Sequence, residues 1–299
     1  MPWLQLRIDA TENNAQQLSD AMEEAGAISV TLEDAADQIL IEPDAEMLPL
    51  WSHTRVVGLF DAASDLEPVK ARLRALLGQE RLPGLQLMVI EDQDWARAWM
   101  DRFEPICFQN DLWVCPSWRT PPDPNACNIY LDPGLAFGTG THASTALCLE
   151  WLGEQALTDK EIVDYGCGSG ILAVAGLKRG AQRAWGVDND PRALTVSAGN
   201  AKKNEVSANY RPVPPESLPP GLQVDIVLAN ILLAPLIALA PRLTALVKPG
   251  GHLVLAGILK DQVSSLRPYY EGGFDLALRT REEWAMLAGA KRAPCDRLD

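Results

Sequence analysis

Basic residues are scarce in this sequence relative to acidic ones. Its 299 residues include 26 lysines and arginines against 40 aspartates and glutamates, which gives a formal net charge of −14 at pH 7. A protein that binds nucleic acid needs a basic face, so this balance argues against direct nucleic-acid binding. An acidic surface instead attracts basic partners over long range, although plain solubility is an equal explanation.

Long apolar segments are also missing. An uncharged run at residues 226–241 is too short for a spanning helix and contains Asn230 and Pro235. The first residues lack the apolar stretch of a signal peptide, and charges already occur at Arg7 and Asp9. The sequence therefore predicts a cytoplasmic protein that does not associate with a membrane.

Metal-binding patterns are absent as well. The six cysteines form no C-x-x-C pair, and the three histidines, His53, His142 and His252, are far apart in sequence. We expect no metal and interpret the cysteines as reduced thiols of a cytoplasmic protein. No feature indicates an obligate interface, so we expect a monomer.

What is present is a globular composition with an uneven charge distribution. Hydrophobic residues make up 47% and charged residues 22% of the chain, and this length predicts two domains, or one with an appendage. Residues 1–92 hold 17 acidic and six basic residues, a net charge of −11, and residues 93–299 carry only −3. The acidity therefore belongs to the first segment.

The first segment, 1–92, has the pattern of a ferredoxin-like domain. A helix is expected from an N-cap at Thr11 to about Glu24, and a second one over 66–77 with Gly78 as its stop. Strands are expected at 3–8, 28–32, 56–60 and 85–91, so the order is βαββαβ. Because this domain lacks a basic face, we interpret it as a recognition domain for a basic protein.

Residues 93–127 are expected to link this domain to the rest. Apolar positions in 93–103 favour a short helix, and residues 106–108 and 112–118 favour a hairpin around the turn 109–111. The third segment, 128–299, alternates strands and helices. The pattern predicts a doubly wound, Rossmann-like α/β sheet that ends in a hairpin with one antiparallel strand.

The most informative stretch is EIVDYGCGSGILA at residues 161–173. It predicts a buried strand, a turn with Gly166, Gly168 and Gly170, and a helix N-terminus, which together form a ligand site in open sheets. Asp164 at the strand end would repel a pyrophosphate but suits a cationic or hydroxyl-rich ligand. Asp188 ends the next strand, where a carboxylate accepts hydrogen bonds from a ribose diol.

This pattern resembles the class I methyltransferases that use S-adenosyl-L-methionine (AdoMet). The alternative is that the glycines only make a tight bend. Three motifs together, DPGLAFGTGTH at 132–142, DYGCGSG at 164–170 and NIL at 230–232, resemble the family of methyltransferases that modify the large-subunit ribosomal protein L-eleven. The resemblance covers nearly the whole chain.

The resemblance implies a set of roles. The N-terminal domain would recognise the basic ribosomal protein, and the C-terminal domain would bind AdoMet through Thr145, Gly166, Asp188 and Asn230. The modified groups would be lysine side chains and the N-terminal amine, with trimethylation. For His142, in the glycine-rich loop, we favour a structural role over a catalytic one.

The predicted catalytic residue is Asn230, at the end of the strand 224–230. Its side-chain oxygen can accept a hydrogen bond from an amine and orient the nitrogen toward the methyl group. Many amine methyltransferases have an aromatic residue shortly after this position, whereas Leu232 offers no ring on which a base could stack. A flexible alkylamine therefore suits the site better than a nucleobase. The alternative is that Asn230 only caps the following helix.

Two other functions remain open from the sequence. One is a methyltransferase acting on RNA or on a small-molecule amine, which the acidic first domain and the missing aromatic residue disfavour. The other is a non-catalytic AdoMet-binding module in ribosome assembly, which the intact glycine turn and Asn230 disfavour.

Overall fold

The computed structural model divides the chain into two compact units, residues 1–100 and 101–299. Each unit has an apolar core of its own. The structure describes residues 2–35, 53–78, 80, 82–90, 103–132 and 142–292. The short helix predicted over 93–103 lies outside these ranges except for its last residue.

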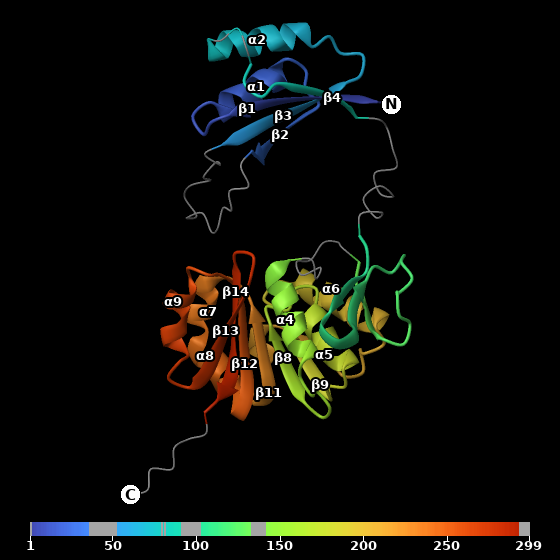
Figure 1. Cartoon of the computed structure of the whole chain (residues 1–299), viewed down its shortest axis with the longest axis vertical. Helices are drawn as coiled ribbons and strands as arrows, with labels where there is room; N and C mark the ends of the chain where they lie inside the picture. The colour runs from blue at the N-terminus through green and yellow to red at the C-terminus, as the bar shows by residue number, and fades with distance from the viewer. Residues whose placement is uncertain are drawn as a thin grey trace, which may run out of the picture. The chain divides into compact units, whose positions relative to one another are not determined.

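The first unit has the predicted βαββαβ order and a four-stranded antiparallel sheet (Figure 1). The strands lie in the order β2-β3-β1-β4, which is the ferredoxin-like arrangement. Alternate strand residues such as Leu6, Ile8 and Phe60 pack against Leu18 and Leu73 of the two helices. The bounds are β1 Trp3–Ala10, α1 Ala15–Glu24, β2 Ser29–Asp34, β3 Thr54–Asp61, α2 Glu67–Leu77 and β4 Gln86–Ile90.

The predicted cap at Thr11 is wrong. Helix α1 begins at Ala15 and its cap position is Asn14, whose side-chain oxygen accepts the backbone N–H of Thr11 at 2.8 Å. This local hydrogen bond makes a turn before the helix and delays its start. The stop of α2 is as predicted, because Gly78 adopts the left-handed conformation at the helix end with a φ of 61°.

The hairpin predicted before residue 127 is part of a small three-stranded sheet. Strands β5 (Ile106–Phe108) and β6 (Leu112–Cys115) pair antiparallel around a 3-10 turn, and β7 (Cys127–Tyr130) pairs parallel with β6. Phe108, Leu112 and Ile129 of this sheet join the core beneath helices α4 (Ala143–Gly153) and α5 (Ile171–Lys178). This small sheet therefore packs as a part of the second unit.

The main sheet of the second unit has seven strands in the order β10-β9-β8-β11-β12-β14-β13. Its central strands are parallel, and β14 is antiparallel to both β12 and β13. This confirms the doubly wound, Rossmann-like fold and its closing hairpin. The bounds are β8 Glu161–Tyr165, β9 Arg183–Val187, β10 Tyr210–Val213, β11 Val224–Asn230, β12 Val247–Leu259, β13 Phe274–Arg281 and β14 Trp284–Lys291.

Helices cover both faces of this sheet, with α4, α5 and α6 on one side and α7, α8 and α9 on the other (Figure 1). Successive residues of β11 belong to different apolar cores. Leu228 faces α4 and α5, whereas Val227 and Ala229 face α7 and α8. Strands buried on both faces explain the nearly continuous apolar run there. The bounds are α4 Ala143–Gly153, α5 Ile171–Lys178, α6 Pro191–Lys203, α7 Leu233–Ala238, α8 Ala240–Leu246 and α9 Val263–Leu266.

Proline explains two interruptions in this unit. The run 233–247 divides into α7 and α8 at Leu239, two residues before Pro241, which lacks the N–H that a continuous helix needs. Helix α9 is only four residues long, because it passes at Arg267 into a 3-10 turn that contains Pro268. Among the described residues, no helix combines the length and the apolar character needed to cross a membrane.

Candidate cofactor and catalytic site

The predicted site residues of three strands meet at one edge of the sheet. Strands β8, β9 and β11 are parallel neighbours, so their carboxyl ends lie together. Asp164 lies near the end of β8, Asp188 directly follows β9, and Asn230 is the last residue of β11. Ligands of open α/β sheets bind at this edge.

The glycine turn presents its backbone outward and its side chains inward. Gly166 and Gly168 are partly exposed, whereas Cys167 and Ser169 between them are buried. Gly166 and Gly168 have φ values of 77° and 50°, in the region that glycine adopts most easily. The N–H groups of Gly166 and Cys167 both donate to the carbonyl of Val187, at 2.7 and 3.0 Å. The turn is thus fixed to the end of β9 with its backbone accessible to a ligand.

Burial raises the pKa of the Cys167 thiol to about 12. The group is therefore a neutral thiol at neutral pH, and it is not activated as a nucleophile. Cys167 packs inside the turn as a small apolar side chain.

The Asp188 carboxylate joins the glycine turn to the end of β9. One oxygen accepts the Gly168 N–H at 3.0 Å, and the other accepts the Asp190 N–H at 3.0 Å. Asp188 is only half-buried, and each carboxylate oxygen keeps a further lone pair. The side chain is therefore oriented by the backbone and still able to accept hydrogen bonds from a diol.

Asp164 lies beneath the turn rather than on its surface. It is 1% exposed, and its carboxylate accepts the N–H of Ala173 in the first part of α5 at 3.2 Å. Burial raises the pKa of Asp164 to about 7. The hydrogen bond from Ala173 lowers this pKa, and the negative charge of Asp188 raises it further. The structure shows Asp164 bracing the turn against α5, and its contact with a ligand remains a prediction.

Thr145 and Asn230 are brought together from positions 85 residues apart. Thr145 is buried in the first turn of α4, and its hydroxyl oxygen accepts a hydrogen bond from the Asn230 side-chain amide at 3.2 Å. Because the NH₂ end of the amide is engaged by Thr145, its oxygen end is the acceptor that has no hydrogen-bond partner among the described residues. The cap position of α7 is Leu232, and that helix has no side-chain cap, so Asn230 does not cap it.

Close packing holds the glycine turn against the segment that follows β11. A Cβ atom at Gly166 would lie 2.2 Å from Cγ2 of Ile231, and a Cβ atom at Gly257 would lie 2.5 Å from the Ile231 carbonyl oxygen. Gly257 has a φ of 84° and lies where the pairing of β12 with β14 changes register. Two glycines thus fix the position of Ile231, and with it that of Asn230.

His142 caps helix α4. Its Nδ1 accepts the N–H of Ser144 and lies 2.8 Å from the Ser144 hydroxyl, and its ring meets the Trp284 ring edge-on at 4.3 Å between centroids. These contacts give His142 the structural role favoured by the sequence. They also hold the N-terminus of α4, where Thr145 lies.

Sequence reasoning missed Gly257 and Asn200, and it included Ile231 in the motif 230–232 without predicting its packing role. Asn200 of α6 donates a hydrogen bond to the Ser169 carbonyl in the glycine turn at 2.8 Å. The asparagines at 200 and 204, in and directly after one amphipathic helix, are an available signal, because asparagine is a poor helix former. No local signal indicates the packing of Ile231 against Gly257, since this contact depends on the register of β12.

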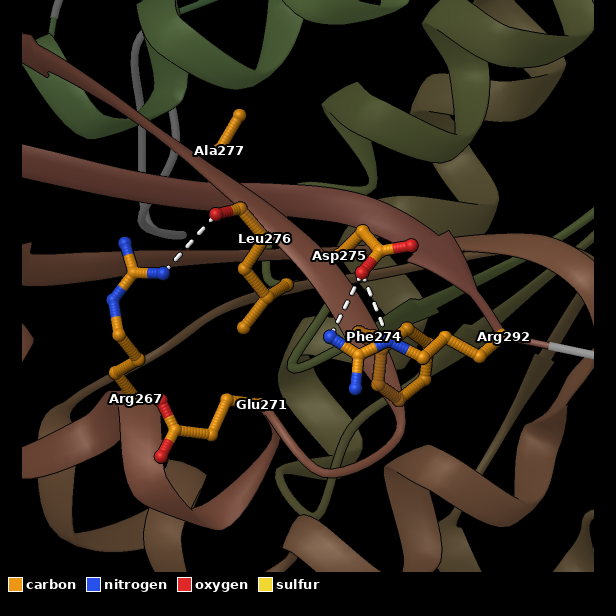
Figure 2. Close-up of a pocket in the computed structure, with 7 residues that line it drawn as sticks. All are labelled: Arg267, Glu271, Phe274, Asp275, Leu276, Ala277 and Arg292. Carbon is orange, nitrogen blue, oxygen red and sulfur yellow. Dashed lines mark hydrogen bonds and ion pairs between the residues drawn. The ribbon is translucent and has the colours of Figure 1, made fainter.

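A surface pocket of about 460 Å³ lies at the outer edge of the sheet (Figure 2). Its charged side chains are two arginines and two acids, and Arg292 is paired with Asp275 at 2.8 Å. It includes none of the predicted site residues. The lining residues are Arg267, Glu271, Phe274, Asp275, Leu276, Ala277 and Arg292.

The sheet order, the glycine turn after β8 and the acid after β9 define the class I methyltransferase fold. The family model described as ribosomal protein L11 methyltransferase (PrmA) matches residues 2–292. Proteins of that name from Azotobacter vinelandii and Shewanella baltica are 50% and 48% identical to this chain, each over 98% of the chain and the whole of the relative. The chain belongs to the ribosomal protein L11 methyltransferase family.

A solved structure also supports the assignment to this family. The ribosomal protein L11 methylase of Lactobacillus delbrueckii subsp. bulgaricus is 27% identical, with a TM-score of 0.58. The match covers 64% of this chain and all of that one.

Proposed function

We propose that this protein is an AdoMet-dependent N-methyltransferase that methylates lysine side chains and the N-terminal amine of ribosomal protein L11, adding up to three methyl groups to each nitrogen. The family membership supports the substrate. The position of Asn230 at the end of β11, next to the strand that leads into the glycine turn, supports the chemistry. The single observation behind the catalytic role is the hydrogen bond from Asn230 to Thr145. Within the part of the chain that the structure describes, this bond leaves the amide oxygen at the edge of the sheet without a partner.

The residues present fit AdoMet. Gly166 and Gly168 expose backbone next to the half-buried Asp188 carboxylate, which can accept hydrogen bonds from a ribose diol. The buried Asp164 carboxyl beneath the turn can supply negative charge to a cationic amino-acid tail, because a nearby cation favours its charged form against the effect of burial. When bound, AdoMet supplies an electrophilic methyl group on a sulfonium.

The contribution of the chain to transfer is orientation. The Asn230 oxygen accepts a hydrogen bond from the substrate amine and so directs the nitrogen lone pair toward the methyl group. A lysine ammonium has a pKa of about 10.4 and must first lose a proton to water, whereas an α-amine, at about 7.7–8.0, loses one more readily. No strong base is needed at Asn230, because its role is to position the neutral amine.

The acidic first unit is proposed to recognise the substrate. Residues 1–92 carry a net charge of −11, which suits a basic ribosomal protein and disfavours RNA. We further propose that the protein acts as a monomer in the cytoplasm, where its substrate is synthesised.

Replacing Asn230 by alanine tests this function. We expect Asn230→Ala to retain AdoMet binding in calorimetry and to lose methyl transfer to unmodified L11 by at least about tenfold, since the amine is no longer oriented. Thr195→Val, on the exposed side of α6, is a control that should leave both unchanged. Unchanged turnover in Asn230→Ala would rule out the proposed catalytic role.

A further inference from the structure

One face of helix α6 serves as a support for the glycine turn. Ser197, Asn200 and Asn204 are spaced three and four residues apart and therefore share a face of the helix. A Cβ atom at Gly170 would lie 2.8 Å from the Ser197 Cβ, so the turn rests directly on this face. Gly170 itself has a φ of 76°.

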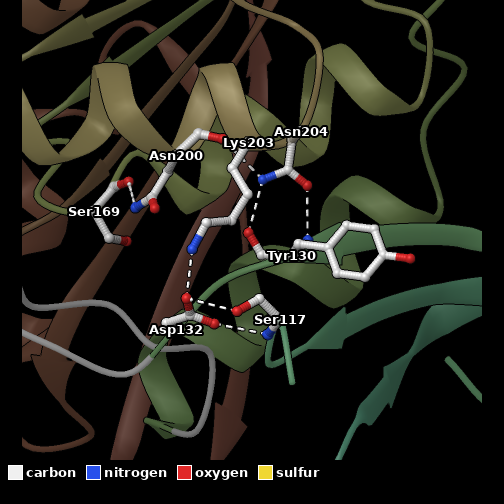
Figure 3. A network of polar contacts seen from close by, with 7 residues as sticks. All are labelled: Ser117, Tyr130, Asp132, Ser169, Asn200, Lys203 and Asn204. Carbon is white, nitrogen blue, oxygen red and sulfur yellow. Dashed lines mark hydrogen bonds and ion pairs between the residues drawn. The ribbon is translucent and has the colours of Figure 1, made fainter. Parts of the chain in front are cut away.

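Asn200 makes the polar contact between helix and turn. Its side-chain NH₂ donates to the carbonyl oxygen of Ser169 at 2.8 Å (Figure 3). Ser169 is only 3% exposed, so its carbonyl has little access to water that could replace this donor. The next residues on either side are Gly168, which donates to Asp188, and Gly170, which rests on Ser197.

The other end of the same face is fixed to strand β7. Asn204 is 2% exposed, and its side chain both accepts the Tyr130 N–H at 2.7 Å and donates to the Tyr130 carbonyl at 2.8 Å. The two hydrogen bonds occupy both backbone groups of Tyr130, as pairing with a neighbouring strand would. These two hydrogen bonds fix the C-terminal end of helix α6 to β7, and they do not involve the glycine turn (Figure 3).

A second anchor lies one residue before Asn204. Lys203 pairs with Asp132, which also accepts the backbone N–H and the hydroxyl of Ser117 at 2.7 and 2.9 Å. Burial opposes ionisation of Asp132, but the hydrogen bonds from Lys203 and Ser117 outweigh it and hold its pKa below the usual value. The Asp132 carboxylate therefore stays charged at neutral pH and keeps its ion pair with Lys203.

We infer that Asn200 is a positioning residue for the cofactor site: anchored through α6 to β7, it holds the Ser169 carbonyl so that the glycine turn keeps its binding-competent shape. This inference rests on the proposed function, because the ligand of the turn is AdoMet there. Asn200 acts through the turn and touches neither the methyl group nor the amine.

The expected effect follows from the conformational freedom of the turn before a ligand binds. Without the Asn200 donor, the turn loses one of the hydrogen bonds that hold it, so a smaller fraction of the molecules keeps the conformation in which the Gly168 N–H meets Asp188. A ligand that binds only one conformation then has its apparent Kd raised in proportion to the fraction lost. If about one tenth of the molecules keep the competent turn, the Kd for AdoMet rises about tenfold. At saturating AdoMet the turn is restored and kcat is unchanged.

The test compares the full-length wild type with Asn200→Ala, Asn200→Asp and Lys202→Ala. Asn200→Asp keeps the side-chain shape but replaces the NH₂ donor by an acceptor, and Lys202 is an exposed residue of the same helix. We expect the Kd of AdoMet by calorimetry, and its KM, to rise about tenfold in both Asn200 variants. We expect kcat at saturating AdoMet to stay within about twofold, and Lys202→Ala to match the wild type.

Two results would overturn the inference while leaving the proposed function intact. One is a Kd within about twofold of wild type in both Asn200 variants. The other is a fall in kcat at saturating AdoMet that equals or exceeds the change in Kd. If Asn200→Ala fails to fold, Asn200→Asp decides alone by the same criteria. A wild type that binds no AdoMet would instead refute the proposed function.

Discussion

The side-chain amide of Asn230 shows how a single hydrogen bond gives a polar group its direction. An amide has a donor end and an acceptor end, and only the acceptor end suits an amine that must keep its lone pair free. Thr145 engages the donor end at 3.2 Å. The family resemblance implies that Thr145 contacts the cofactor, and the structure gives it this additional role.

Replacing Thr145 by valine should lower kcat more than it changes the KM for AdoMet. Valine keeps the shape of the buried side chain but cannot accept the Asn230 hydrogen bond, so the amide loses its fixed orientation. One such bond contributes about 1 kcal/mol, which corresponds to a roughly fivefold to tenfold fall in kcat. Steady-state methylation of L11 measures it, and an unchanged kcat would show that Thr145 does not orient Asn230.

The buried carboxyl of Asp164 should make stability depend on pH. Its pKa in the fold is about 7 against an ordinary value of 3.8, so folding takes up a proton between these values. Stability from this group is therefore fully present below about pH 4 and is lost as the pH rises toward 7. Asp164→Asn keeps an acceptor for the Ala173 N–H and removes the titration.

We therefore expect the stability of Asp164→Asn relative to wild type to increase by roughly 2–3 kcal/mol between pH 5 and pH 8, because raising a pKa by one costs the charged form about 1.4 kcal/mol. Urea unfolding of both proteins at the two pH values measures this change. A stability difference that is the same at both pH values would contradict the raised pKa of Asp164.

At the scale of elements, the glycine turn and the end of β11 depend on each other. Gly166→Ala would force a left-handed conformation on alanine and place its Cβ against Ile231. We expect a loss of roughly 1–3 kcal/mol in unfolding free energy and at least about a tenfold weaker binding of AdoMet.

The matched control for this change is Gly199→Ala. Gly199 lies in α6 with open space around its Cβ position, so alanine there should stabilise the helix by roughly 0.5–1 kcal/mol. Thermal unfolding and calorimetry of both variants test the pair. Normal AdoMet binding by Gly166→Ala would show that the turn does not depend on its fit against Ile231.

The elements also show how far the sequence predicts the structure. Apolar alternation and the glycine and proline signals locate nearly every described strand and helix, because burial on one or both faces leaves a strong periodic pattern. The sequence pattern misplaces the cap of α1 at Thr11, because a hydrogen bond between Thr11 and Asn14 competes with helix formation. Contacts such as Asn200 to Ser169 and Gly257 to Ile231 could not be predicted, since they require the packing of elements distant in sequence.

At the scale of the whole molecule, the uneven charge should appear in the kinetics. If residues 1–92, with a net charge of −11, attract a basic protein, kcat/KM for L11 should fall as salt rises from about 50 to about 300 mM, because the Debye length shortens. The KM for AdoMet provides the internal control and should change much less. A flat dependence for L11 would contradict electrostatic attraction by the first unit.

Methyl transfer to ribosomal protein L11 is tested most directly by the intact mass of unmodified L11 after incubation with this protein and AdoMet. We expect a series of methyl increments that requires AdoMet and is lost with Asn230→Ala. An unchanged mass of L11, under conditions where calorimetry shows that AdoMet is bound, would contradict the proposed activity and leave only the cofactor site.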